Sequence, residues 1–243
     1  MNIINLIPMA GEGKRFKNKG FKTPKPLILV NGTPMVIKAL KSLPKAHKNI
    51  LIVRKDHLDI NKFTSLLNEN FDNNLIIEID NLTDGQASTC LIAEKHIPDD
   101  SILNIGACDV GFEYNHSQYL KKLKFYDSFV WTYRNNQNVI NNPNMYGWIK
   151  LKENEEFIEY VSCKKPVSEN LLNDHVVSGT FTFKKAKDCF DAIKKMIENN
   201  DRVNGEYYLD TAINYIKKKS TIFEIKKFHS WGTPDELNFY EKI

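Results

Sequence analysis

The chain has 243 residues, of which 42% are hydrophobic, and this is enough to bury one substantial core. Lys and Arg number 34 against 30 Asp and Glu, so the formal charge of +4 is far below what binding to a nucleic-acid backbone requires. No stretch approaches the roughly 18 apolar residues of a membrane span, and the first residues lack a secretory leader. We therefore expect a cytoplasmic protein with neither a nucleic-acid nor a membrane partner.

The first half of the chain alternates short apolar runs with amphipathic segments. The apolar runs predict strands at 3–8, 49–53, 74–79 and 101–105. Apolar positions at helical spacing predict helices at 34–43, 60–69 and 88–95. Strands that alternate with helices in this way predict a Rossmann-like, three-layer α/β fold, in which helices cover both faces of a mostly parallel sheet.

The second half, after about residue 126, has a different pattern. Alternating and aromatic-rich runs predict strands at 129–133, 147–151 and 177–183, which are typical of a small antiparallel extension. Helices are predicted near 185–199 and 206–218. We expect residues 1–243 to form a single domain with halves 1–126 and 127–243. The Asn-rich stretch 135–144 is predicted to be a loop, either a lid or an idle connection.

Two short motifs in the first half place basic residues in glycine-rich or stiff backbone. In the segment 11–16, Phe16 stands where a dinucleotide-binding fingerprint has its third glycine, and the segment is not a Walker A loop either. Its backbone N–H groups and Arg15 could still meet phosphate oxygens. Lys25 lies between Pro24 and Pro26, so its ammonium is presented with little lost freedom. Taken separately, a glycine turn after a strand and a surface lysine between prolines explain these motifs equally well.

Together the two motifs have a composition and order that are much rarer than either part. They resemble the amino-terminal signature of the sugar-phosphate nucleotidyltransferase family, and the similarity continues through 30–35. Five later blocks are similar to blocks of the family and follow in the same order, at 84–89, 107–109, 164–166, 205–210 and 231–235. The resemblance thus covers most of the chain.

The resemblance implies transfer of a nucleoside monophosphate from an NTP to a small phosphorylated acceptor, with Mg²⁺ as cofactor and release of pyrophosphate. It implies that Arg15 and Lys25 are catalytic and hold the triphosphate, and that Asp109 binds the metal. The implied nucleotide-binding residues are Ala10, Gly11, Glu12, Gly13, Lys14, Gly85, Gln86 and Ser88. The implied acceptor-binding residues of the second half are Lys164, Lys165, Gly179, Glu206 and Asp210.

Glu206 and Asp210 are four residues apart, so we expect both carboxylates on one face of the helix predicted at 206–218. There they could contact a polar acceptor or support the metal. A solvated helix face explains the pair nearly as well.

Three positions depart from the family pattern. Lys164 and Val177 replace a Glu and an Asn that commonly contact sugar hydroxyls, which makes an ordinary hexose 1-phosphate a doubtful acceptor. Ser230 replaces a carboxylate that often completes metal binding. The opening is most similar to a capsule-associated branch of the family, which implies CTP as donor and L-glutamine phosphate as acceptor.

Three questions stay open at this point: the activity, the base and the oligomeric state. A sugar 1-phosphate or phosphocholine nucleotidyltransferase is the first alternative, and a nucleotide-binding regulatory protein without catalysis is the second. The base read by Gln86 and Ser88 is not determined by one sequence, and a homodimer is possible.

Overall fold

The computed structural model describes residues 1–56, 58–153 and 156–242. Its central sheet begins with four parallel strands, β1 (Ile3–Pro8), β4 (Lys48–Arg54), β5 (Asn74–Ile79) and β6 (Ile102–Ile105). They lie in the order β6-β1-β4-β5, with β1 at the centre. All four agree with the predicted strands to within one residue at each end.

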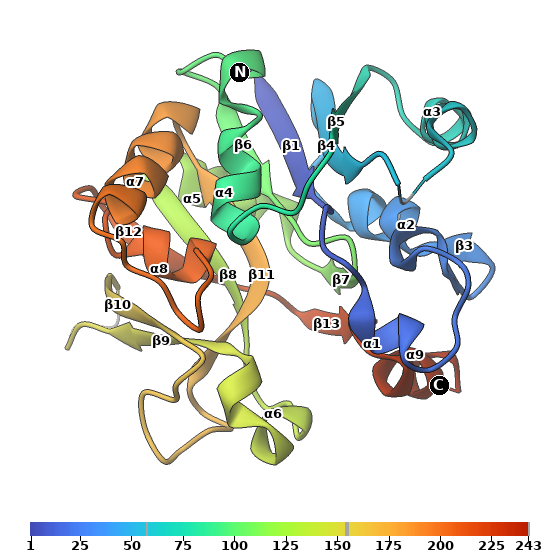
Figure 1. Ribbon diagram of the computed structural model, residues 1–243. Coiled ribbons are helices and arrows are strands. Elements are labelled where there is room, and N and C mark those ends of the chain that lie inside the picture. Colours follow the sequence, from blue (N-terminus) through green and yellow to red (C-terminus); the bar gives the residue numbers. More distant parts are fainter. Residues whose placement is uncertain (57, 154–155, 243) are drawn as a thin grey trace.

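Helices cover both faces of this sheet (Figure 1). On one face lie α2 (Met35–Ser42), α3 (Ile60–Asn70) and α5 (His116–Phe125), which share a core with the side chains of Ile3 and Ile7. On the other face lie α4 (Gln86–Leu91), α7 (Ala186–Glu198) and α8 (Leu209–Ile213), which pack with Ile4 and Leu6. Successive side chains of a strand point to opposite faces, so the apolar run of β1 serves both layers. The predicted three-layer α/β fold is confirmed.

Two predicted helices differ in extent from the observed ones. The helix expected at 88–95 begins earlier, at Gln86, and ends at Leu91, and a separate 3-10 turn, η2 (Glu94–His96), follows it. The helix expected at 206–218 is restricted to α8, so residues 206–208 precede it. For the second helix the reason is tertiary, because the Tyr207 N–H donates to Asp84 O and the Tyr207 carbonyl accepts from the Ala87 N–H, which keeps the residues before Leu209 out of the helix.

The antiparallel extension consists of β8 (Ser128–Tyr133), β9 (Gly147–Leu151), β10 (Ile158–Cys163), β11 (His175–Phe183) and β12 (Ser220–Glu224). Strand β11 pairs antiparallel with β6, β8 and β9, and β9 pairs antiparallel with β10. Strand β12 is the exception, because it runs parallel to β8. Because β11 pairs with β6, the parallel region and the antiparallel extension form one continuous sheet.

Strand β11 is irregular at its centre. The register with β8 shifts between Val177 and Phe181, and Gly179 there has φ +82°, which only glycine adopts at low cost.

The stretch expected to be a loop at 135–144 instead contains a short helix, α6 (Asn138–Asn141), followed by the 3-10 turn η3 (Pro143–Met145). Val139 of α6 is buried and ties this segment to the core.

The end of the chain returns to the first half (Figure 1). Strand β13 (Lys227–Ser230) pairs antiparallel with β7 (Val110–Glu113), and α9 (Pro234–Glu241) begins at a Thr233 cap. Trp231 is buried with Phe16 and Leu237 in a small core of its own. The remaining short elements near it are α1 (Lys14–Lys17), η1 (Lys25–Leu27), β2 (Leu29–Val30) and β3 (Thr33–Pro34). Residues 227–241 therefore lie with the first half, whereas the boundary expected at 126 placed them in the second.

A line of polar side chains crosses the otherwise apolar sheet. Buried Asn104 donates to Asn5 Oδ1 (3.0 Å) and accepts from Tyr119 (3.1 Å) and Thr182 (2.8 Å). Trp131 in turn donates to Thr182 Oγ1 (2.8 Å). Buried polar groups are costly unless they are paired, and here each partner satisfies the next.

Among the described residues, no helix has the length and apolar character that crossing a bilayer requires.

Candidate active site

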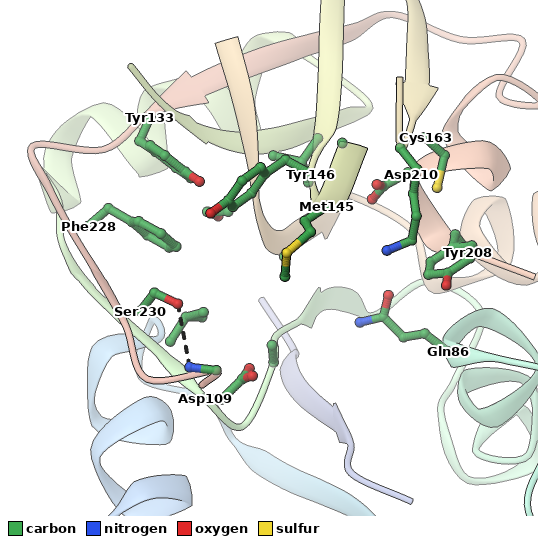
Figure 2. A pocket seen from close by; sticks show the side chains of 18 of the residues that line it. Gln86, Asp109, Tyr133, Met145, Tyr146, Cys163, Tyr208, Asp210, Phe228 and Ser230 are labelled. Atoms are coloured by element: carbon green, nitrogen blue, oxygen red, sulfur yellow. Dashed lines mark hydrogen bonds between the residues drawn. The ribbon is translucent and has the colours of Figure 1, made fainter. Parts of the chain in front are cut away.

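A cleft opens beyond the carboxyl ends of β1 and β6, where open α/β sheets place their ligands. Figure 2 shows Asp109 and Ser230 at one end of this cleft and Asp210, Tyr208 and Gln86 at the other, with Met145 and Tyr146 between them. The extension supplies much of the lining, because Cys163 and Lys164 lie at and just after the end of β10 and Val177–Gly179 at the irregular centre of β11. The cleft thus joins the two halves of the sheet.

Lys25 and Asp109 form an ion pair at the first end of the cleft. The distance from Lys25 Nζ to Asp109 Oδ2 is 2.5 Å, and each side chain is only 21% exposed. Burial opposes the charged form of both groups, yet the nearby opposite charge outweighs it. The pKa of Asp109 is therefore held below its usual range and the pKa of Lys25 above its usual range. Both groups are charged at neutral pH.

Arg15 lines the same cleft as Asp109. It also lines a second hollow, which borders Lys25, Lys14, Glu206 and the turn at Gly13. Gly13 has φ +66°, and a Cβ at this position would lie 3.3 Å from the Cβ of Lys25. The glycine turn therefore brings its backbone close to Lys25, as the predicted phosphate-binding motifs require. The three residues on which the sequence argument depended lie together rather than on separate surfaces.

The rest of the glycine turn is more open. Met9 and Ala10 are buried at the end of β1, whereas Gly11 is exposed. Lys14 pairs with Glu12 (2.6 Å), and both side chains face the second hollow. The turn is thus partly open to solvent beside Lys25.

The loop at 84–86 is fastened to the segment before α8. The backbone N–H of Tyr207 donates to Asp84 O (2.7 Å), and the N–H of Ala87 donates to Tyr207 O (3.0 Å). Gly85 has φ +115°, and a Cβ there would lie 2.6 Å from Tyr207 O, so glycine is required. Arg202 stacks over the Tyr207 ring (4.0 Å) and donates to the Asp84 carboxylate (2.9 Å). This fastening directs Gln86 into the cleft, whereas Ser88 does not line it.

The expected acceptor residues divide into two groups. Lys164, Gly179 and Asp210 line the cleft. Lys165 is exposed and does not line it, so Lys164 is the lysine that the backbone, with φ +59° at this residue, turns toward the site. The expectation that Glu206 and Asp210 share a helix face is wrong, because α8 begins only at Leu209. Glu206 instead lies beside Lys14 in the second hollow.

Asp210 lies in a closely fitted part of the cleft. A Cβ at Gly147 would overlap the Asp210 carboxylate, so this strand position must be glycine. Burial raises the pKa of Asp210 to about 6, although Lys164 and hydrogen bonds from Cys163 and the Asp210 backbone act in the opposite direction. Burial also raises the pKa of the Cys163 thiol to about 12, so this cysteine is a weak hydrogen-bond donor rather than a nucleophile.

The sequence motifs did not indicate two further residues of the cleft. Ser178 lines it, and the Ser178 hydroxyl is buried without a hydrogen-bond partner among the described residues. Glu236 of α9 reaches it from the end of the chain. Only the glycine irregularity at 179 could have drawn attention to Ser178, and nothing in the α9 sequence distinguishes Glu236 from an ordinary first-turn acid that follows a Thr cap.

The residues at the Asp109 end have the chemistry for a hard divalent cation. A Cβ at Gly232 would lie 3.0 Å from Asp109 Oδ2, 3.3 Å from Glu236 Oε2 and 3.7 Å from Ser230 Oγ, so glycine keeps the space between three oxygens open. Magnesium prefers such oxygen ligands and commonly takes others from substrate phosphates and water. The described residues contain no cluster of three or more metal-ligating side chains. A cation here would therefore depend on the phosphates of a nucleotide.

Comparisons with known proteins indicate the family of the chain. A family model described as nucleotidyl transferase matches residues 4–235. The bifunctional protein GlmU of Methanococcus aeolicus is 26% identical over 238 residues, which is 96% of this chain. The chain spans only 52% of the length of that relative.

Two solved structures share the fold. The nucleoside-diphosphate-sugar pyrophosphorylase from Vibrio cholerae RC9 superposes with a TM-score of 0.80 at 17% identity, covering 98% of this chain and 100% of that one. The inositol-1-phosphate CTP transferase from T. maritima superposes with a TM-score of 0.74 at 14% identity, covering 99% of this chain and 94% of that one. With a family match over nearly its whole length, the chain belongs to the nucleotidyl transferase family.

Proposed function

We propose that the chain transfers CMP from CTP to a small phosphorylated acceptor and releases pyrophosphate. The observation that carries this proposal is the arrangement of one cleft: Arg15 and Asp109 lie at its first end, and Lys164 and Asp210 lie at its second. Lys25 pairs with Asp109 from the adjoining hollow, which Arg15 also lines. A donor triphosphate at the first end would leave its α-phosphorus facing an acceptor held at the second.

The side chains of the cleft supply charge neutralisation and orientation. An acceptor phosphate is already a nucleophile, so no side chain has to remove a proton before it attacks the α-phosphorus of the nucleotide. The obstacle is repulsion between two polyanions, which fixed cations reduce most when they lie in a site poor in water. Arg15 and Lys25 take this role, and they neutralise the charge that develops on the departing pyrophosphate.

The proposed cofactor is Mg²⁺, held by Asp109 with support from Glu236 and Ser230. When bound, the ion neutralises negative charge on the phosphate oxygens that lie beside it. Asp109 has a second role, because its carboxylate orients the Lys25 ammonium. Ser230 removes one carboxylate from the expected pattern, and Glu236 supplies another from a different element.

Residues at the second end favour CTP and a phosphate ester or amide that carries further charged groups. Gln86 offers both a donor and an acceptor to the edge of a base, and the structural similarity to a CTP transferase supports cytosine. Lys164 presents an ammonium where a sugar-binding site needs hydroxyl acceptors, and it would suit a carboxylate. L-Glutamine phosphate, the acceptor implied by the resemblance to the capsule-associated branch, is therefore the proposed acceptor.

A second candidate is a sugar 1-phosphate nucleotidyltransferase. It is favoured by the similarity to a nucleoside-diphosphate-sugar pyrophosphorylase, which covers all of that protein.

A matrix of donors and acceptors distinguishes these candidates. Pyrophosphate release is measured for CTP, UTP, dTTP, ATP and GTP, each with L-glutamine phosphate, phosphocholine, inositol 1-phosphate and hexose 1-phosphates. We expect the highest kcat/KM with CTP and L-glutamine phosphate. A hexose 1-phosphate as the fastest acceptor would favour the second candidate, and no release with any pair in Mg²⁺ would indicate a regulatory nucleotide-binding protein.

A further inference from the structure

The Asp210 carboxylate lines the cleft near Lys164, whose charge acts on it from a distance. Among the described residues, no ion pair includes Asp210, and its carboxylate is held by hydrogen bonds from the Cys163 thiol and from its own backbone. A buried carboxylate is stable in its charged form only when an opposite charge compensates it. Because burial raises the pKa of Asp210 more than the charge of Lys164 and the hydrogen bonds lower it, the protein by itself compensates this charge only in part.

The neighbouring lysine is directed elsewhere. The Lys164 ammonium lies over the ring of Tyr208, 5.1 Å from its centroid, rather than on the carboxylate. The Lys164 backbone is constrained, with φ +59° and an N–H that donates to Tyr146 O (3.0 Å). The two opposite charges therefore border the same cleft as separate groups, each available to a ligand.

The walls around Asp210 preserve this arrangement. Glycine at 147 is the one residue type that leaves room for the carboxylate, since any Cβ there would overlap it. The buried Ser178 hydroxyl, which has no hydrogen-bond partner among the described residues, lines the same cleft from β11. A carboxylate without an ion pair and a hydroxyl without a hydrogen bond, both among the described residues that line the cleft, point to a ligand that brings donors.

We propose that Asp210 binds a cationic group of the acceptor, a primary ammonium, and so selects phosphorylated amines over neutral phosphorylated alcohols and sugars. This inference rests on the proposed transferase activity and adds to it the residue that recognises the substrate class. Lys164, which lines the same cleft with the opposite charge, would bind an anionic group of the same molecule. Charge recognition by one residue of each sign discriminates strongly, because a substrate that lacks either group leaves a buried charge without a partner.

Acceptor pairs in which one member carries a free amine, and the other lacks it, has a hydroxyl in its place or has it acetylated, test the proposal. The pairs are phosphoethanolamine with ethyl phosphate, D-glucosamine 1-phosphate with D-glucose 1-phosphate, and L-glutamine phosphate with its N-acetyl derivative. For every pair that the wild-type protein turns over with CTP and Mg²⁺, we expect the amine-bearing member to have a KM at least about 10-fold lower. Equal KM values within the pairs, or preference for the amine-free members, would overturn the proposal.

The substitution Asp210→Asn keeps the shape of the side chain and removes its charge. It should raise KM for amine-bearing acceptors by about 10-fold or more, and by at least about 3-fold more than for the amine-free members. Asp100→Asn, at an exposed position outside the cleft, is the matched control. An equal rise in KM for both members of a pair would mean that Asp210 is structural and would overturn the assignment.

Calorimetric titration separates this inference from the proposed function. The same pairs are titrated into the protein in the presence of a CTP analogue with a methylene bridge between the α- and β-phosphates. If no pair is turned over but the amine-bearing members bind more tightly in an Asp210-dependent way, only the proposed reaction fails. If the members of each pair bind equally or none binds, the inference fails.

Discussion

Lys25 and Asp109 hold opposite charges in a part of the cleft that is mostly closed to water. Each keeps the other ionised against the cost of burial, so removal of one charge would leave the other uncompensated. The pair also fixes the position of the Lys25 ammonium, whose backbone is already restricted by Pro24 and Pro26. We therefore expect that removing the charge of Asp109 reduces the proposed activity more than it reduces the stability of the fold.

The substitution Asp109→Asn tests that inequality. We expect kcat for pyrophosphate release to fall by at least about 100-fold, because the carboxylate acts on the metal and on Lys25. The free energy of unfolding should fall by only about 1–2 kcal/mol, because the side chains stay partly accessible. Rates at saturating Mg²⁺ and thermal unfolding measure the two effects. An undiminished rate would show that another carboxylate carries the metal.

The Asp210 carboxylate gives a prediction about pH. Its folded pKa of about 6 lies above the unfolded value near 3.9, so it favours folding only in its neutral form. That favourable contribution is complete below about pH 4 and is lost as the pH rises through 6. The ligand-free Asp210→Asn protein should therefore exceed the wild type in stability by about 1–3 kcal/mol at pH 7.5 and match it near pH 4. Thermal unfolding at both pH values, with Asp100→Asn alongside, measures this difference, and a pH-independent gain would contradict it.

At the scale of elements, the loop at 84–87 and the segment before α8 are joined by backbone hydrogen bonds. Backbone hydrogen bonds join Asp84 and Ala87 to Tyr207, only three residues before Asp210. The loop that presents Gln86 and the segment that presents Asp210 are thus held in a fixed relation. This relation depends on close backbone approach at Gly85.

The substitution Gly85→Ala should separate the two elements. Its Cβ would collide with the backbone of Tyr207, and its backbone conformation disfavours any side chain. We expect KM to rise about 10-fold or more for donor and acceptor together, whereas a local effect on the nucleotide would raise only the donor KM. Steady-state kinetics with each substrate varied in turn distinguishes these outcomes. Gly20→Ala, which has a similar backbone conformation but open space around its Cβ, is the matched control.

At the scale of the whole molecule, the polar line through the sheet joins the two halves. Asn104 of β6 connects Asn5 in the parallel region to Thr182 in the antiparallel extension. The substitution Asn104→Ala leaves several buried groups without partners and should cost about 2–4 kcal/mol of unfolding free energy. Urea denaturation measures this loss, and the exposed Asn81→Ala is its control. A loss no larger than that of the control would mean that the network is dispensable.

The fold was largely predictable from the sequence, because its signals are local. The apolar runs of β1, β4, β5 and β6 and the glycine turn before Arg15 are each contained within a few residues. Helix limits were less predictable. Glu206 and Asp210 have helical spacing, but the backbone bonds of Tyr207 to the base loop delay the start of α8 until Leu209.

The sequence by itself determined the family, the three-layer sheet and the basic and acidic residues at the first end of the cleft. Only the tertiary structure decided that Lys164 rather than Lys165 lines the cleft, that Glu236 returns to the side of Asp109, and that Asp210 forms no ion pair with any described residue. The physical reason is the distance along the chain over which each kind of interaction acts. Hydrophobic periodicity and turn chemistry act between near neighbours, whereas the direction and charge balance of a cleft residue depend on segments that meet only after the chain has folded.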